Sequence, residues 1–353
     1  MELQLKQRQR NDVAFVLGNG KSRLNIDPRN FQERGVVYGC NALYREFAPD
    51  YLVAVDVKMV NEIIASGYHR THQVWTNSNK GITSKSNINF LKICLKSLEN
   101  NSAFKHEIIM HVNSGEDGTL NFLKNNNYKY TYSSRNRGLC SSVNCAVKKS
   151  STNYILYAHD DMYFLPEWDL ILKKEIEKIG HNFFYLHAIE MGPNGAHIKI
   201  DCGDSFNNFD EKKLLEGYKN FYFNNSNASH LSPHLIHKDL WESVSGFSEE
   251  YDPGDGSDPD LVLKLWNKGV RYFKCLEGFR VYHFGSTTTR KRSELKLNKG
   301  TSTFIKKWGI SPYILRRFYL RTGEKFKIHA KIKKNIFYFL TLLKVKIKRL
   351  FIT

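Results

Sequence analysis

The chain has 353 residues, and its 41% hydrophobic and 13% aromatic content can supply a substantial core, which excludes an intrinsically disordered protein. Its length is too great for one ordinary domain and sufficient for two. The formal net charge is +18, but residues 286–353 carry 19 Lys and Arg against two Glu, so the rest of the chain is nearly neutral. A nucleic-acid enzyme would more often be basic over its whole working surface, so this distribution favours a basic tail that attaches the protein to an anionic partner.

The sequence also disfavours a secreted or an integral membrane protein. Residues 1–12 are polar and charged, and the apolar run behind them is too short for a signal peptide. No run of 18 or more uncharged apolar residues is present, so we expect no transmembrane helix. The six cysteines include no CxxC pair, and we expect them to be reduced thiols in a cytoplasmic protein rather than a metal cluster.

Residues 1–78 are predicted to form a small Rossmann-like α/β unit. Three apolar runs are typical of strands separated by glycine turns and helices: 13–17, 36–40 and 51–56. The turn Gly18-Asn19-Gly20-Lys21-Ser22, with residues 25–27 and 39–44, resembles the opening of family 42 sialyltransferases. That resemblance implies a turn close to a CMP-sugar, where backbone N–H groups can hold phosphate. Because a lone glycine turn is a weak signal, we interpret the unit as structural or vestigial rather than as a second active site.

Residues 79–285 are predicted to form a larger α/β domain behind a polar linker at 79–89. Helical and strand patterns then alternate, with helices near 90–98, 117–123 and 139–148 and strands near 107–112, 128–132 and 154–158. The alternation predicts an open, mainly parallel sheet with helices on both faces. Ligands of such sheets bind beyond the carboxyl ends of strands, and Asn113, His159, Asp160 and Asp161 all fall at such ends.

The candidate metal site follows the strand predicted at 154–158. Adjacent carboxylates such as Asp160 and Asp161 at the end of a buried strand are costly unless they are solvated or bind a cation. Hard oxygen ligands suit Mg²⁺ or Mn²⁺, which can neutralise the two phosphates of a nucleotide-diphosphate sugar. The alternative is an ordinary turn in which Asp160 caps the next helix.

Several stretches resemble, in order, the family 2 glycosyltransferases of the GT-A fold: residues 94–98, 107–119, 136–139 with Asn144, and 159–161. The resemblance implies a sheet that binds a nucleotide-sugar, with Asp161 as a metal ligand. It places donor contacts at Asn113, Asp117, Asn136, Gly138, Asn144, His159 and Asp160. His159 stands where the family has its first Asp, which faces the ribose. The polar stretch before Phe90 also departs from the apolar strand that the family usually has there, so we expect a base-binding wall that is altered or supplied by residues 1–78.

Downstream, residues 232–247 resemble the acceptor side of that family. Pro259 suits the first turn of a helix ending near Lys268, with Asp258 as its N-cap. The resemblance implies that Asp258 is the general base, with Asp260 as second choice, although Ser257 replaces the usual Glu. Such a carboxylate would deprotonate the acceptor hydroxyl as it attacks the anomeric carbon, with inversion there.

His283 follows a predicted strand that ends residues 79–285. It resembles a histidine that reaches the metal or the diphosphate in many GT-A enzymes. A purely structural role for this histidine is an equally open interpretation.

Residues 286–353 are predicted to be a basic helical region. Apolar residues recur at helical spacing between lysines: Ile336, Phe339, Leu340, Leu343, Ile347 and Leu350. We expect this amphipathic helix to attach the protein to the cytoplasmic membrane face, where lipid-linked or envelope glycans are built. Packing on the body is the alternative. Nucleic-acid binding is disfavoured because the body carries no matching motif.

The sequence thus predicts an inverting, metal-dependent glycosyltransferase for polysaccharide synthesis. It would move a sugar from a UDP- or GDP-type donor to a glycan or lipid-linked acceptor. Two alternatives stay open, a catalytically inactive glycan- or membrane-binding protein and a nucleotidyl- or phosphosugar-processing α/β enzyme that uses the same carboxylates.

Overall fold

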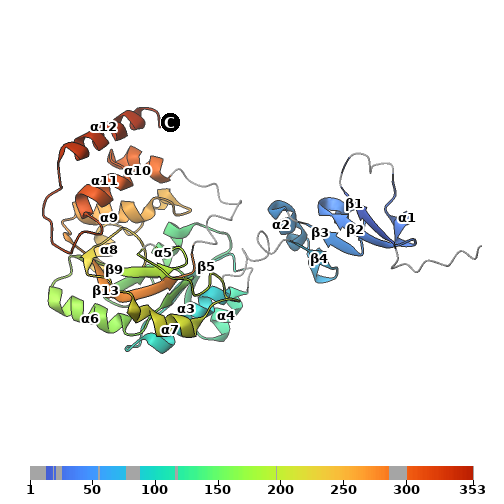
Figure 1. Cartoon of the computed structure of the whole chain (residues 1–353), viewed down its shortest axis with the longest axis horizontal. Helices are drawn as coiled ribbons and strands as arrows, with labels where there is room; N and C mark the ends of the chain where they lie inside the picture. Colours follow the sequence, from blue (N-terminus) through green and yellow to red (C-terminus); the bar gives the residue numbers. More distant parts are fainter. Residues whose placement is uncertain are drawn as a thin grey trace, which may run out of the picture. The chain divides into compact units, whose positions relative to one another are not determined.

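The computed structural model describes residues 13–18, 20, 26–54, 56–76, 88–115, 118–195, 197–285 and 300–352. The chain divides into two compact units, the first within Met1–Ser86 and the second built from Asn87–Thr287 and Glu294–Thr353 (Figure 1). The described residues of the basic C-terminal region, 300–352, belong to the second unit. None of the helices in the described ranges has the length and hydrophobicity needed to span a bilayer.

The first unit is a parallel four-stranded sheet with short helices, as the sequence predicted. Its strands run in the order β1 (Ala14–Leu17), β2 (Val36–Cys40), β3 (Tyr51–Val53) and β4 (Val74–Trp75). The helices are α1 (Arg29–Gln32), α2 (Val57–Ala65) and two 3-10 turns, Asn41–Arg45 and Tyr68–Arg70. Leu52, Val60 and Ile63 form a small core between β3 and α2. Most of the glycine turn lies outside the described residues, namely Asn19, Lys21 and Ser22.

The second unit is built on a seven-stranded sheet in the order β11-β13-β9-β12-β7, with β10 added to β9 and β8 to β13. The strands are β7 (Tyr154–Tyr157), β8 (Met162–Phe164), β9 (Phe184–Gly192), β10 (Ile198–Lys199), β11 (Ser226–Asn227), β12 (His234–His237) and β13 (Tyr272–His283). The long strands β9 and β13 are parallel, and so are β9 and β10. Because β12, β8 and β11 pair antiparallel with their neighbours, the sheet is mixed.

Helices cover both faces of this sheet, so its central strands are buried on both sides (Figure 1). Phe184, Leu186 and Ala188 of β9 face a cluster that includes Trp168 of α6. Tyr185 faces the opposite cluster, which the helix α9 dominates. The helices are α3 (Ile88–Asn101), α6 (Trp168–Ile179), α7 (Glu211–Gly217), α5 (Leu139–Val147), α8 (Lys238–Ser243) and α9 (Ser257–Asn267), with 3-10 turns at Tyr218–Asn220 and Glu249–Tyr251. The predicted α/β class is confirmed.

A separate parallel pair, β5 (Ile109–Asn113) and β6 (Lys129–Ser133), carries α4 (Thr119–Asn125) between its strands. The C-terminal region adds α10 (Gly300–Trp308), α11 (Pro312–Ile314), a π-helical turn (Leu315–Leu320) and α12 (Ile336–Leu350). Phe304, Ile314, Phe318 and Tyr338 of this region join the same apolar cluster as α9. The C-terminal helices are thus part of the core of the second unit.

Candidate active site

Three metal-ligand side chains meet at one end of the main sheet. The segment after β7 carries His159 and Asp161 into β8, and β8 pairs antiparallel with the end of β13, where Met162 lies opposite His283. Nε2 of His283 is 3.2 Å from Oδ1 of Asp161, and Nδ1 of His159 is 3.9 Å from the same oxygen. One ligand atom from each residue lies within 4.8 Å of the other two. This spacing is small enough for one cation to contact all three.

Glu190 holds the ring of His283 in that orientation. Its Oε1 is 2.9 Å from Nδ1 of His283, so the opposite nitrogen, Nε2, faces Asp161. Burial alone would lower the pKa of His283, but Asp161 and Glu190 raise it to about 10. A carboxylate behind a histidine is the usual support of a metal-bound imidazole. Sequence reasoning missed Glu190, because nothing in its own stretch of β9 shows that β13 ends beside it.

His159 is fixed from its other side. Its Nε2 lies 2.9 Å from the hydroxyl of Tyr157 and 3.1 Å from Oγ of Ser232, and this leaves Nδ1 toward Asp161. Burial lowers the pKa of His159, although Asp161 opposes the shift. A neutral imidazole with one nitrogen held by hydroxyl groups can offer the other nitrogen to a cation. The structure therefore brings His159 into the same cluster as Asp161 and His283.

A second cluster of ligand-type side chains is present among the described residues, and its chemistry is less suitable. It contains His187, His197 and Cys275. Nδ1 of His197 accepts the backbone N–H of Glu190 at 3.1 Å, so the proton of the neutral ring is on Nε2, which faces Cys275. His187 and Cys275 are direct neighbours on β9 and β13, which explains their proximity by strand register alone. Burial also raises the pKa of the Cys275 thiol to about 12.

Asp258 lies in the first turn of α9 but is not its N-cap. The helix begins at Ser257 and its N-cap is Gly256, so the predicted capping role of Asp258 is wrong, because the left-handed glycine turns the chain two residues earlier. Pro259 occupies the first turn as predicted. Oδ1 of Asp258 is buried and accepts no hydrogen bond from the described residues. This burial raises the pKa of Asp258 to about 7.

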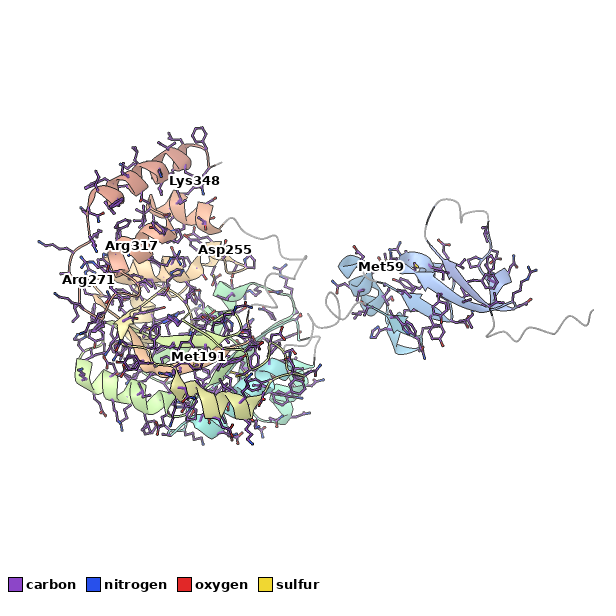
Figure 2. All side chains as sticks on the ribbon, in the orientation of Figure 1. Met59, Met191, Asp255, Arg271, Arg317 and Lys348 are labelled. Atoms are coloured by element: carbon purple, nitrogen blue, oxygen red, sulfur yellow. The ribbon has the colours of Figure 1, made fainter. Side chains whose placement is uncertain are left out.

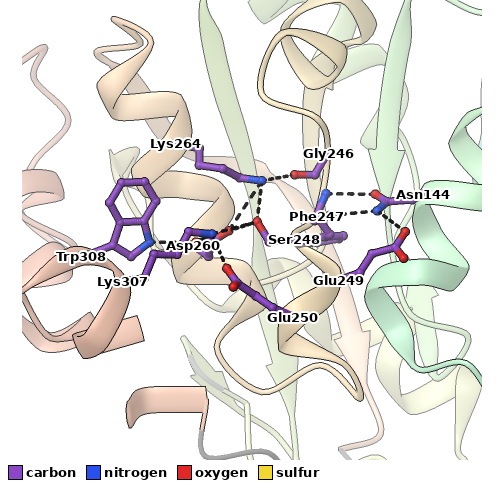
Figure 3. Close-up of polar contacts among 10 residues, drawn as sticks. All are labelled: Asn144, Gly246, Phe247, Ser248, Glu249, Glu250, Asp260, Lys264, Lys307 and Trp308. Carbon is purple, nitrogen blue, oxygen red and sulfur yellow. Dashed lines mark hydrogen bonds and ion pairs between the residues drawn. The ribbon is translucent and has the colours of Figure 1, made fainter. Parts of the chain in front are cut away.

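Asp260 has the opposite environment, because its fully buried carboxylate is surrounded by donors (Figure 3). Oδ2 accepts a hydrogen bond from Oγ of Ser248 at 2.6 Å, and Oδ1 accepts one from Nε1 of Trp308 at 2.8 Å. Nζ of Lys307 is 2.8 Å and Nζ of Lys264 is 3.6 Å from the carboxylate. The structure therefore places Asp260 in a link between α9 and α10.

Tyr157 connects the region of Asp258 to the ligand cluster. Burial raises its pKa well above the usual value, and the negative charges of Asp258, Asp161 and Asp160 raise it further. The hydroxyl of Tyr157 also contacts His159. Tyr157 therefore contacts the acidic segment after β7 through His159, and the pKa of its hydroxyl responds to the charge of Asp258 at the start of α9.

The residues predicted to contact the donor sit in a network around the start of α5. Nδ2 of Asn113 donates to Oγ of Ser142 at 2.8 Å, and its Oδ1 accepts the N–H of Arg137 at 3.0 Å. Oδ1 of Asn136 accepts the N–H of Gly138 at 2.9 Å. Asp117 lies outside the described residues.

Asn144 is hydrogen-bonded to the segment that follows α8 (Figure 3). Its amide donates to the carbonyl of Phe247 at 2.9 Å and to Glu249 at 3.2 Å, and it accepts the N–H of Phe247 at 3.0 Å. Because both amide hydrogens are used, the side chain of Asn144 holds two segments together and has no free N–H for a nucleotide-sugar.

Asp252 fixes the start of α5 to the loop that leads to Asp258. It accepts the N–H of Cys140 at 2.7 Å, and the N–H of Leu139 donates to the carbonyl of Pro253 at 3.2 Å. Gly138 precedes them with φ of +92°, and a Cβ on it would lie 2.4 Å from Oδ1 of Asp252. The glycine is therefore required by both conformation and space. Sequence reasoning missed Asp252, since its partners are more than 100 residues away.

Residues 82–228 match the family model described as Glycosyl transferase family 2. The predicted resemblance to family 2 glycosyltransferases is confirmed. This match supports a glycosyltransferase. The matched glycosyltransferase segment includes His159, Asp161 and Glu190, whereas Asp258 and His283 lie beyond its end. No curated protein matches the chain.

The solved structures that resemble this chain share little sequence identity with it. The S. aureus TarS 1–349 structure has a TM-score of 0.42 at 16% identity, covering 56% of this chain and 57% of TarS 1–349. GalNAc-T7 with UDP, GalNAc and Mn²⁺ has a TM-score of 0.45 at 12% identity, covering 62% of this chain and 45% of GalNAc-T7. The chain thus spans a little over half of the TarS 1–349 structure that it matches.

Proposed function

We propose that this protein is an inverting glycosyltransferase that moves a sugar from a nucleotide-diphosphate donor to a glycan or lipid-linked acceptor. The observation that carries the proposal is the joint placement of Asp161, His159 and His283, with Glu190 behind His283 and the hydroxyl of Tyr157 against His159. The family match to residues 82–228 supports the same reaction class.

The three ligand-type side chains at the end of the sheet fit a divalent cation. One carboxylate and two imidazoles suit Mn²⁺ better than Mg²⁺, which prefers oxygen ligands and loses its water reluctantly. Asp161 and His283 would hold the ion, with His159 as a third ligand and Asp160 beside them on the donor. When bound, the ion would supply positive charge for the donor diphosphate as the nucleotide leaves. Glu190 would keep Nε2 of His283 directed at the ion.

Asp258 is the better of the two candidate bases. A general base needs a free lone pair and a pKa near the working pH, and the buried Oδ1 of Asp258 with a pKa of about 7 meets both conditions. Asp260 is already held by Ser248, Trp308 and Lys307, so we assign it a structural role. In this mechanism Asp258 takes the proton of the acceptor hydroxyl while that oxygen attacks the anomeric carbon.

The donor contacts expected at Asn113, Asn136 and Gly138 stay proposals, as does Asp117. In the described structure these groups shape the loop before α5, whose first N–H groups belong to Leu139 and Cys140. We therefore propose that they act on the donor by fixing this loop. The choice between UDP- and GDP-sugars is left to experiment.

Product analysis of the purified chain with UDP- and GDP-sugars, with and without Mn²⁺, tests this proposal. We expect release of the free nucleoside diphosphate with formation of a glycoside, and loss of both in Asp161→Asn. Asp239→Asn, an exposed carboxylate on α8, is the matched control. Release of a nucleoside monophosphate or of a sugar phosphate would identify a nucleotidyl- or phosphosugar-processing enzyme instead. Donor binding without any turnover would identify a binding protein.

We also propose that the protein works as a peripheral protein on the cytoplasmic face of a membrane. The excess of Lys and Arg in residues 286–353 supports this location, since anionic lipid attracts about 1 kcal/mol per basic residue near the surface.

A further inference from the structure

Helix α12 is held against the second unit by one narrow face. Tyr338 and Val345 are buried there and join the apolar cluster of α9 and α10. Nη2 of Arg349 donates to the carbonyl of Lys306 in α10 at 2.7 Å. Oδ1 of Asn335 caps the helix by accepting the N–H of Tyr338 at 3.0 Å. The helix is therefore formed and fixed before it meets any partner.

The rest of α12 and its end present apolar side chains to solvent. Eight large apolar residues are between 50% and 82% exposed: Ile336, Phe337, Phe339, Leu340, Leu343, Ile347, Leu350 and Phe351. Apolar residues of a surface helix normally face the protein core. Here the helix packs through a different face, so most of its apolar surface is unpartnered. A contiguous exposed apolar patch of this kind marks an interaction surface.

The helical geometry gathers these residues on one side and places lysines along its edges. At about 100° per residue, Phe339, Leu350, Leu343, Ile336, Ile347 and Leu340 span an arc of roughly 100° opposite Tyr338 and Val345. Lys346 borders this arc on one edge, and Lys344 and Lys348 border it on the other. All three lysines are exposed, and Figure 2 marks Lys348 on this helix.

We infer that α12 is a preformed docking surface that lies in the plane of an anionic membrane interface. Its 15 residues are too few to cross a bilayer, which needs about 20, but they suffice to lie within the headgroup region. The apolar arc enters the boundary with the acyl chains, and the lysines at its edges extend to lipid phosphates. Residues 325–353 contain no Asp or Glu, so nothing in them repels an anionic surface.

Charge and hydrophobicity together select this occupant over two others. A second copy of the chain would bring two strongly basic helices into contact, and their charges would repel. A nucleic acid would pair with Lys344, Lys346 and Lys348 but would leave the apolar arc in water. An anionic lipid surface is complementary to both features. The inference rests on the proposed membrane location and does not depend on the proposed sugar transfer.

Co-sedimentation of the full chain with vesicles tests the inference. We expect binding to vesicles of phosphatidylcholine with phosphatidylglycerol and at least tenfold weaker binding to pure phosphatidylcholine. The double variant Leu343→Glu with Ile347→Glu changes the centre of the arc and should lose at least tenfold in vesicle binding. Phe206→Glu with Tyr222→Glu adds the same charge at exposed aromatic residues outside α12, which are 49% and 82% exposed, and should bind as the parent does.

Further experiments measure the contribution of the lysines to vesicle binding and test the two other partners, a second copy of the chain and a nucleic acid. Replacing Lys344, Lys346 and Lys348 by Gln should weaken binding to the anionic vesicles and reduce its dependence on salt. Unchanged vesicle binding by the Leu343 and Ile347 variant, with an unchanged melting temperature, would overturn the inference. Two other results would also overturn it. One is a parent chain that does not bind vesicles and instead dimerises through α12. The other is a parent chain that does not bind vesicles but binds duplex DNA, with the same affinity as the variant that carries the two Glu. Donor turnover in vesicle-free solution should be the same in parent and variant, so a failure here is distinct from failure of the sugar-transfer proposal.

Discussion

Asp258 and Asp260 are separated by one residue in the first turn of α9. Their surroundings differ, and the difference supports a role as general base for Asp258 and a structural role for Asp260. The carboxylate of Asp260 is satisfied by Ser248, Trp308 and Lys307. Oδ1 of Asp258 is buried without a donor among the described residues. An unpaired buried carboxylate costs stability, and such costs are concentrated at functional sites.

The pH dependence of turnover follows from the pKa of about 7 at Asp258. A base must be deprotonated, so we expect kcat/KM to fall about tenfold per pH unit below that value and to be level above it. Asp258→Asn should lose roughly 10²- to 10⁴-fold in kcat/KM. Asp239→Asn, which changes an exposed carboxylate, should keep both the rate and the profile. A parent profile that is flat between pH 5 and pH 8 would contradict the assignment.

Asp258 also makes stability depend on pH. Its pKa rises from 3.8 in the unfolded chain to about 7 in the fold, so the folded state binds the proton more tightly. The contribution of this group to stability is complete below about pH 4 and declines until the pH passes about 7. Asp258→Asn removes the decline and should be more stable than the parent above pH 7, by roughly 4 kcal/mol at most. Urea unfolding at pH 5 and pH 8 measures the difference, and a parent-like pH slope in the variant would contradict it.

Glu190 gives a residue-scale test of the metal proposal. Removing the charge behind His283 in Glu190→Gln should weaken Mn²⁺ binding by about 10- to 100-fold, because the ring loses its support and some basicity. Titration calorimetry with Mn²⁺ measures this directly. Glu277→Gln, an exposed position on β13, is the matched control and should bind Mn²⁺ as the parent does. Equal affinities in the two variants would show that Glu190 does not support an ion.

Sequence reasoning reached the ligand-type residues but not their supports. Asp161 and His283 were expected as metal ligands from the resemblance to GT-A glycosyltransferases, because the strands that precede them are readable along the chain. Glu190 and Asp252 were missed because their roles exist only through contacts made across the fold, 93 residues away in the case of His283. Asn144 was predicted as a donor contact, yet its amide is engaged by Phe247, about 100 residues downstream.

At the scale of elements, the link between α9 and α10 organises the C-terminal half of the second unit (Figure 3). Lys307 and Trp308 come from α10, and both reach the carboxylate of Asp260 in α9. Asp260→Asn should therefore destabilise the protein by about 3 kcal/mol, because it leaves buried donors and a partly buried lysine without their charge partner. The urea midpoint checks this. Asp258→Asn at the same helix start is the control, and a loss of similar size in both variants would contradict the two environments described.

The predicted elements were most accurate where periodicity is long. The helices expected at 90–98 and 139–148 are α3 and α5, and the strand expected at 154–158 is β7. The antiparallel pairing of β12 and β8 was not foreseen, since pairing direction depends on contacts between distant segments. The helix α9 starts two residues earlier than predicted, because Gly256 adopts φ of +88° and ends the preceding turn.

At the scale of the molecule, the two compact units and the position of the C-terminal helices predict how the chain can be divided. Residues 87–353 should fold alone, with cooperative urea unfolding. Residues 87–285 should not, because Phe304, Ile314 and Phe318 would be missing from the cluster around α9. Each such side chain contributes about 2 kcal/mol when buried, against a total stability of about 5–15 kcal/mol. Near-ultraviolet circular dichroism measures the packing, and native-like spectra from the shorter fragment would contradict this.

The contact between Arg349 and the carbonyl of Lys306 lies one residue before Lys307, and Lys307 reaches Asp260, two residues after Asp258. These contacts connect α12 through α10 to the first turn of α9, which carries the proposed base. The proposed anchor and the proposed base are thus joined by a path only a few side chains long, and we expect the rate of turnover to report how α12 is attached.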